Sequence, residues 1–217
     1  MKSNTLKLRT RIKFCGFTRA QDAELAVSLG VDALGFVLVP GTPRFIKPEA
    51  AYSIRRNLPP LVSTVALFRN AEPAFVREAL DALKPSIAQF HGDEDVAYCE
   101  SFGIPYFKAV PMADPQDLTK LATIYASATA LLLDGHDAKT MGGSGLTFDW
   151  GLVRAFDKPL ILAGGLKHAN VADGIAQLHP YAVDVSSGIE ASPGIKDFEK
   201  MRAFARAVRH ADQELNK

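Results

Sequence analysis

Short runs of apolar residues recur along the chain and are rich in β-branched and aromatic side chains. They lie at residues 12–15, 33–37, 62–68, 87–90, 106–110, 130–133, 160–162 and 182–185. Most of these runs are continuously apolar and do not alternate with polar positions. Such continuity is typical of strands that are buried on both faces of a parallel sheet. We therefore predict eight parallel strands.

Segments with the apolar periodicity of helices separate these strands. They span residues 18–29, 48–57, 73–83, 94–102, 115–126, 149–156, 170–178 and 196–210. Thr18 is the expected N-cap of the first segment and Gly30 its stop signal. Regular alternation of strand and helix, without a linker, predicts the α/β class and a single closed (β/α)8 TIM barrel. An open doubly wound sheet is the alternative, but it normally uses fewer units, and the GxGxxG fingerprint is absent from the sequence.

Composition and length fit one globular domain with a short extension. The chain has 217 residues, of which 47% are hydrophobic and 23% charged, and this suits a one-domain barrel. We assign residues 1–10 to a polar, basic tail and residues 11–217 to the barrel. The tail lacks the apolar segment of a signal peptide, and the apolar runs are far shorter than the ~20 residues of a membrane span. We expect a cytoplasmic protein that contacts no membrane.

The charges are balanced, with 25 Lys and Arg against 24 Asp and Glu. A chain without a strong positive field is not expected to bind nucleic acid, so any anionic ligand must be bound by local groups. The two cysteines, Cys15 and Cys99, lack the spacing of a zinc site and indicate reduced thiols rather than a disulfide framework. We expect no metal.

Two candidate catalytic residues lie at the carboxyl ends of predicted strands, where barrel enzymes place their chemistry. Cys15 ends the first strand and is a candidate nucleophile or general base, with a buried apolar role as the alternative. Asp134 follows the sixth strand and could act as a general acid if its pKa is raised, with a loop cap as the alternative. Lys13 shares the face of Cys15 on an extended strand, so it is a candidate for the cation that favours a thiolate. Cys99 lies within a predicted helix, and we expect it to be structural.

Two further side chains could contact a ligand. Arg44 lies beside Pro43 in the loop after the second strand, where a stiffened backbone suits the guanidinium to a carboxylate. A surface arginine in a turn is the alternative. His91 follows the fourth strand and could hydrogen bond to a substrate, although a lone histidine is more often a satisfied wall residue.

Glycine-rich loops follow the last three strands. The first of these loops contains Gly143 and is long enough to fold over a substrate. Gly164 and Gly165 follow the seventh strand, and Ser187 and Gly188 follow the eighth. Exposed backbone N–H groups in these two neighbouring loops predict a phosphate site, with simple tight turns as the alternative. The loops have no Walker lysine, which disfavours nucleotide hydrolysis.

Taken together and in this order, the motifs resemble those of the phosphoribosylanthranilate isomerase family. The resemblance covers nearly the whole chain from Arg11. Seven groups of sequence motifs match in the same order, and this makes the resemblance specific. The matching strings lie at residues 13–18, 33–36 with 43–45, 89–93, 131–134, 142–145 with 148–150, 162–166, and 184–190 with 193–197.

The resemblance implies an isomerase of tryptophan biosynthesis, which converts N-(5-phosphoribosyl)anthranilate to 1-(2-carboxyphenylamino)-1-deoxyribulose 5-phosphate by an Amadori rearrangement without cofactor or metal. It implies that Asp134 is the general acid that opens the furanose ring and that Cys15 is the general base that removes the C2 proton. Arg44 matches the residue that holds the anthranilate carboxylate. The other expected substrate-binding residues, including the phosphate grip, are His91, Gly143, Gly164, Gly165, Asp184, Ser187 and Gly188. The expected partner is a small phosphosugar, and the expected assembly is a monomer or a homodimer.

Other readings remain open at this point. The histidine-pathway isomerase with two aspartates and indole-glycerol-phosphate synthase with a Lys/Glu pair are related phosphate-binding barrels. Cys15 at the end of the first strand argues against both, and a dual-substrate isomerase would be expected to use an aspartate there. A non-catalytic phosphosugar-binding barrel is a different class of function. The presence of Cys15, Asp134 and Arg44 together counts against it.

Overall fold

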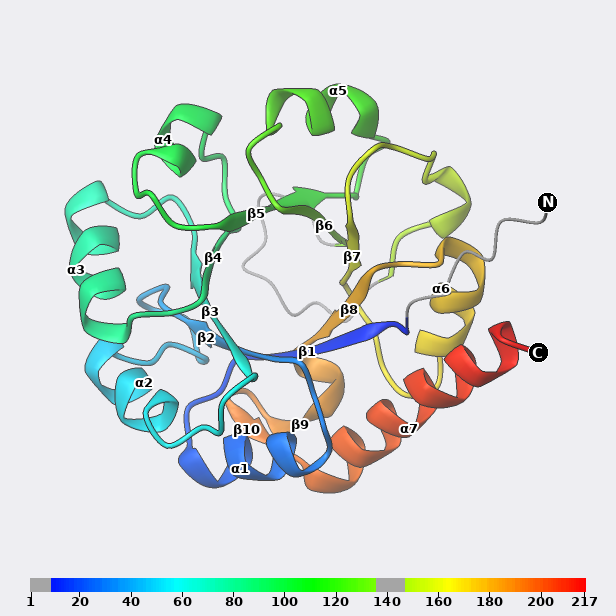
Figure 1. The fold of residues 1–217 in the computed structure, drawn as a ribbon, viewed down its shortest axis with the longest axis horizontal. Coiled ribbons are helices and arrows are strands. Elements are labelled where there is room, and N and C mark those ends of the chain that lie inside the picture. The colour runs from blue at the N-terminus through cyan, green and yellow to red at the C-terminus, as the bar shows by residue number, and fades with distance from the viewer. Residues whose placement is uncertain (1–8, 136–146) are drawn as a thin grey trace.

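The computed structural model describes residues 9–135 and 147–217, and it confirms the predicted TIM barrel (Figure 1). Within these residues eight parallel strands close a barrel in chain order, so that β1 pairs with both β2 and β8. The strands are β1 (Arg11–Cys15), β2 (Ala33–Val37), β3 (Ser63–Phe68), β4 (Ile87–Phe90), β5 (Tyr106–Pro111), β6 (Ala130–Asp134), β7 (Leu160–Leu162) and β8 (Ala182–Val185).

Helices surround the barrel on its outer side (Figure 1). They are α1 (Ala20–Ser28), α2 (Pro48–Arg55), α3 (Pro73–Leu83), α4 (Val96–Glu100), α5 (Leu118–Ile124), α6 (Val171–Leu178) and α7 (Phe198–Leu215), with two single turns of 3-10 helix, η1 (Trp150–Leu152) and η2 (Ser187–Ile189). Proline at the first turn of α2 and α3 fits the helix start, because its missing N–H would be unpaired there in any case.

Several predicted helices differ from the structure. Residues 94–102 and 115–126 form the shorter helices α4 and α5, and three other differences are larger or involve other contacts. The segment 149–156 forms only η1, because the Asp149 carboxylate caps one turn through Gly151 N at 2.9 Å and the backbone is extended again at Val153. The first helix begins at Ala20 with Arg19 as its N-cap, and the Thr18 hydroxyl donates to the Gly194 carbonyl. The last predicted helix began at residue 196, but the chain there forms a small antiparallel pair, β9 (Glu190–Ser192) and β10 (Ile195–Lys196), ahead of α7.

Alternation along each strand separates two apolar layers. Side chains such as Phe14, Leu34 and Phe90 face the helices and are fully buried there. The opposite face fills the inside of the barrel with a smaller cluster that includes Val65, Phe107, Leu132 and Ile161. Neighbouring side chains on a strand point to opposite faces, so every second residue faces the inside of the barrel. The inward-facing polar residues at the carboxyl ends of the strands therefore lie at the barrel mouth.

Two residues of the segment that the sequence assigned to the tail, Arg9 and Thr10, form hydrogen bonds with the barrel. The backbone N–H and hydroxyl of Thr10 donate to Asp212 at 2.9 and 2.7 Å. Arg9 donates to Asp32 through Nη1 at 2.9 Å, and Asp32 also accepts from Ile12 N at 2.8 Å. Partial burial acts to raise the pKa of Asp32, but the bonds from Arg9 and Ile12 hold it below its ordinary value. Across the described residues, no helix combines the length and the apolar character that a membrane crossing requires.

Candidate active site

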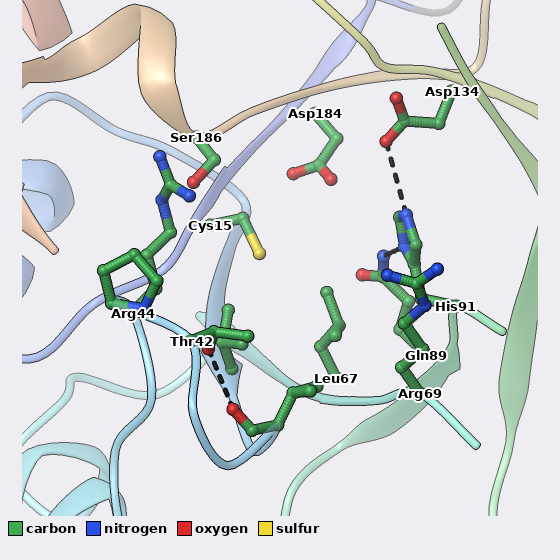
Figure 2. Close-up of a pocket in the computed structure, with 13 residues that line it drawn as sticks. Cys15, Thr42, Arg44, Leu67, Arg69, Gln89, His91, Asp134, Asp184 and Ser186 are labelled. Carbon is green, nitrogen blue, oxygen red and sulfur yellow. Dashed lines mark hydrogen bonds and ion pairs between the residues drawn. The ribbon is translucent and has the colours of Figure 1, made fainter. Parts of the chain in front are cut away.

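The carboxyl ends of the strands surround a cavity of about 130 Å³ (Figure 2). Five of the residues that the sequence selected line this cavity, and they come from five different strands or strand ends: Cys15, Arg44, His91, Asp134 and Asp184. Figure 2 shows Cys15 and Arg44 on one side, Asp134 and His91 on the other, and Asp184 between them. Apolar side chains, among them Val37, Val39 and Leu67, complete the wall. Polar groups around an apolar cavity of this kind are typical of a small-molecule site.

The Cys15 thiol lies at the end of β1 and is almost fully buried, with 3% of the residue exposed. Gly35 of β2 pairs with Cys15 in the barrel register, and a Cβ at Gly35 would lie 2.6 Å from the sulfur. Glycine at this position therefore provides the space that the thiol occupies. Burial raises the pKa of the Cys15 thiol, and the Asp184 charge adds to this effect, while the cations Lys13 and Lys196 oppose it.

Lys13 lies one layer below Cys15 inside the barrel and forms a buried ion pair with Asp184. Its Nζ atom is 2.8 Å from Asp184 Oδ1, and the two residues are register partners on β1 and β8. Burial alone would lower the pKa of Lys13, but Asp184 and Cys15 together raise it above the ordinary lysine value. Lys13 is therefore a fixed cation beneath the thiol, as the sequence suggested.

Asp134 ends β6 and contacts a chain of two other polar side chains. His91 Nε2 is 3.4 Å from Asp134 Oδ2, and Gln89 Nε2 is 2.7 Å from His91 Nδ1 (Figure 2). In this orientation of the Gln89 amide, Nε2 donates and His91 Nδ1 accepts, so the ring proton of a neutral His91 lies on Nε2, facing Asp134. Gln89 and His91 together therefore hold a donor against the Asp134 carboxylate.

Arg44 has a partner that the sequence analysis did not assign. The guanidinium binds Glu190 through Nε to Oε1 at 3.0 Å and through Nη2 to Oε2 at 2.8 Å. Burial acts to raise the pKa of Glu190, but the bonds from Arg44 and from Lys196 hold it below the ordinary value. Glu190 is therefore a carboxylate that fixes the Arg44 side chain at the edge of the cavity.

The predicted phosphate-binding residues lie in two loops that contact each other beside the cavity. A Cβ at Gly188 would lie 2.0 Å from the carbonyl oxygen of Leu166, so the loop after β8 packs directly on the loop after β7. Gly164 and Gly165 both have positive φ angles, 78° and 62°, which glycine adopts without strain. These two glycines, Ser187 and Gly188 do not line the described cavity.

Of two other residues that the sequence singled out, only Cys99 lies in the described part of the chain. Gly143 lies outside the described residues. Cys99 is buried in α4, and burial raises its pKa to about 12, as expected for a structural thiol. Within residues 9–135 and 147–217, no group of three or more His, Cys, Asp and Glu side chains is arranged to hold a metal ion.

Comparison with known proteins bears on this site directly. The family model described as "N-(5'phosphoribosyl)anthranilate (PRA) isomerase" matches residues 12–207. The chain belongs to this family. It is therefore an isomerase, and the resemblance inferred from the sequence motifs is confirmed.

Individual relatives agree over almost their whole length. The N-(5'-phosphoribosyl)anthranilate isomerase of Nitrosococcus oceani is 48% identical over 202 residues, which cover 93% of this chain and 98% of the relative. The crystal structure of phosphoribosyl anthranilate isomerase from Thermus thermophilus has 39% identity and a TM-score of 0.85, and the match covers 93% of this chain and 99% of that one. A second family structure, 34% identical with a TM-score of 0.79 and the same coverage, is a complex with reduced 1-(o-carboxyphenylamino)-1-deoxyribulose 5-phosphate.

Proposed function

We propose that this chain catalyses the Amadori rearrangement of N-(5'-phosphoribosyl)anthranilate to 1-(2-carboxyphenylamino)-1-deoxyribulose 5-phosphate in tryptophan biosynthesis. The observation that carries the proposal is the arrangement around one cavity of a thiol, a carboxyl group and an arginine from separate strands: Cys15, Asp134 and Arg44. A thiol and a carboxyl group on different sides of one cavity suit a reaction with one proton donation and one proton abstraction. Such a reaction needs neither a metal nor a cofactor.

In the first step, Asp134 gives its proton to the furanose ring oxygen. The bond between C1 and this oxygen breaks, and the lone pair of the anthranilate nitrogen forms a C1=N double bond, which gives a protonated Schiff base. The acid must carry a proton before this step. Asp134 is buried, with 6% of the residue exposed. After the proton has left, His91 can donate a hydrogen bond to the Asp134 carboxylate.

In the second step, the Cys15 thiolate removes the proton from C2. The electrons of the C2–H bond form a C1=C2 double bond, and those of C1=N return to nitrogen. The resulting enolamine becomes the ketone when the C2 hydroxyl loses its proton and C1 gains one. Lys13 beneath the sulfur favours the thiolate, while burial disfavours it. The balance predicts a base that is mostly protonated before the substrate binds.

The two ends of the substrate are anions, and the proposal gives each its own site. Arg44 binds the anthranilate carboxylate from the loop after β2. The loops after β7 and β8 bind the phosphate through Gly164, Gly165, Ser187 and Gly188, with Gly143 as a further contact. Asp184 and His91 contact the sugar between these ends. Two anion sites across one mouth would hold C1 and C2 between the acid and the base.

The experiment that tests these roles compares wild type with Cys15→Ser and Asp134→Asn. Each substitution is expected to lower kcat by at least about 100-fold, because a general acid or base contributes on this scale. In D2O, the wild-type product is expected to carry one deuterium at C1. Near wild-type turnover in either variant would remove that residue from the mechanism.

We also propose that the enzyme is cytoplasmic and that it is a monomer or a homodimer. Light scattering after gel filtration distinguishes these assemblies from larger ones, and cell fractionation tests the location.

A further inference from the structure

Lys196 is a buried cation to which the mechanism above gives no role. It lies on β10, and its side chain is fully buried. The Nζ atom lies 2.8 Å from Glu190 Oε1, contacts the carbonyl oxygen of Cys15, and is 3.5 Å from the carbonyl oxygen of Ser186. Three acceptors surround one nitrogen, and this suits the three donors of an ammonium group.

The carboxylate of Glu190 is shared between two cations. Its Oε1 atom accepts from Lys196 Nζ at 2.8 Å and from Arg44 Nε at 3.0 Å, while its Oε2 atom accepts from Arg44 Nη2 at 2.8 Å. Only Arg44 of these three lines the cavity. Another carboxylate, Asp22, accepts from the backbone N–H of Lys196 but is bound in bidentate fashion by Arg19. Burial acts to lower the pKa of Lys196, and the Glu190 carboxylate opposes this effect. With Lys196 protonated, two cations and one carboxylate leave the cluster with one net positive charge.

An arginine and a glutamate that form an ion pair have no net charge together, so the pair attracts a second carboxylate only weakly. An incoming anion would meet the attraction of Arg44 and the repulsion of Glu190 at similar distances. A second cation behind Glu190 offsets that repulsion, and the effect is large here because the side chains of Glu190 and Lys196 are 4% and 0% exposed and therefore poorly screened by water.

We propose that Lys196 is a positioning residue that keeps the Arg44–Glu190 pair cationic, so that Arg44 can be held rigidly by Glu190 and still bind the carboxylate of the substrate. Through its bond to the Cys15 carbonyl, Lys196 also ties this anion site to the strand that carries the base. The inference rests on the proposed function, since it requires Arg44 to face the substrate carboxylate.

The test measures how strongly the enzyme prefers a ligand with the carboxylate over one without it. The two probes are reduced 1-(o-carboxyphenylamino)-1-deoxyribulose 5-phosphate and the matched compound with an unsubstituted phenyl ring. Their Kd values are compared for wild type, Lys196→Met and the charge-restoring double variant Lys196→Met/Glu190→Gln. Lys200→Met is the control, because the Lys200 ammonium group donates to the backbone carbonyl of Glu190 and the residue is exposed.

Lys196→Met is expected to lower the preference for the carboxylated probe about tenfold, with little change in the Kd of the phenyl probe. The double variant is expected to restore most of the preference, because the cluster regains one net positive charge. A merely structural lysine would not give this rescue. Lys200→Met is expected to behave as wild type. If Lys196→Met does not fold, Glu190→Gln alone carries the test and is expected to increase the preference.

Two results would overturn the inference while the proposed function stands. One is an undiminished preference in Lys196→Met, and the other is a double variant no better than the single variant although both bind the phenyl probe. A wild type that shows no preference for the carboxylated probe would instead contradict the assignment of Arg44, and the inference would fail with it.

Discussion

The sulfur of Cys15 fills the space in which any residue at position 35 other than glycine would place its Cβ atom. That atom would lie 2.6 Å from Sγ and 3.2 Å from both Cα and Cβ of Cys15. Gly35 and Cys15 are register partners on the adjacent strands β2 and β1, so the two strands cannot move apart without disturbing the barrel. The absence of a side chain at Gly35 thus determines where the proposed base can sit.

Gly35→Ala is therefore expected to displace the thiol and to lower kcat by at least about tenfold, since displacements of about 1 Å can cost more than that. Overpacking at this site is also expected to cost about 1–3 kcal/mol in the free energy of unfolding. Kinetics and urea denaturation measure the two effects. The double variant Gly35→Ala/Cys15→Gly provides the control, because it should regain stability without regaining activity. Unchanged kcat in Gly35→Ala would contradict the packing argument.

The charge of Lys13 should set the pH at which Cys15 becomes reactive. Burial raises the thiol pKa above its ordinary value and Lys13 opposes this rise, so kcat/KM is expected to increase with pH as the thiolate forms. Lys13→Met should move the increase to higher pH. Asp184→Asn should move it to lower pH, because the Asp184 charge acts to raise the thiol pKa. The rate of alkylation of Cys15 by iodoacetamide, followed against pH, gives the same comparison without turnover, and shifts in the same direction for both variants would refute this assignment.

The Gln89 side chain should determine which nitrogen of His91 carries the proton. With Gln89 Nε2 2.7 Å from His91 Nδ1, the neutral ring is expected to be protonated on Nε2, toward Asp134. Nitrogen-15 NMR of labelled histidine reads this tautomer directly. Gln89→Met is expected to release the ring and to lower kcat about tenfold with a smaller change in KM. An Nδ1-protonated ring in the wild type would contradict the hydrogen-bond assignment.

Thr10 and Asp212 should contribute measurably to the stability of the barrel. Asp212 accepts from both the backbone N–H and the hydroxyl of Thr10, which is 5% exposed. Asp212→Ala leaves both donors without this acceptor and is expected to lower the free energy of unfolding by about 1–3 kcal/mol. Thr10→Val removes the hydroxyl alone and should cost less. Equal stability of wild type and Asp212→Ala would contradict a stabilising role for this contact.

The barrel and most of the cavity lining could be predicted from the sequence because both depend on local signals. Continuous apolar runs mark buried parallel strands, and in a closed barrel the residue that ends each run must point toward the same mouth. Cys15, Asp134 and His91 were found in this way, and the structure brings them to one cavity. The roles assigned to them remain predictions that the variants above test.

The features that were missed depend on tertiary contacts. Arg44 and Glu190 are separated by 146 positions in the chain. They pair only because the loop after β2 and the segment after β8 meet in the closed barrel. Lys196 looked like the start of a helix, whereas the chain uses it in β10 to reach Glu190. Thr18 has the chemistry of an N-cap, but Arg19 holds the N-cap position in the structure, and the Thr18 hydroxyl donates to the distant Gly194 carbonyl.

The most direct test of the central claim is the decay of anthranilate-type fluorescence when the purified chain, with a metal chelator present, is mixed with freshly generated N-(5'-phosphoribosyl)anthranilate. Rapid decay is expected in the wild type, and decay slower by at least about 100-fold is expected in Cys15→Ser. A folded wild-type protein that leaves the fluorescence unchanged would contradict the proposed reaction and favour a barrel that binds a phosphosugar without converting it.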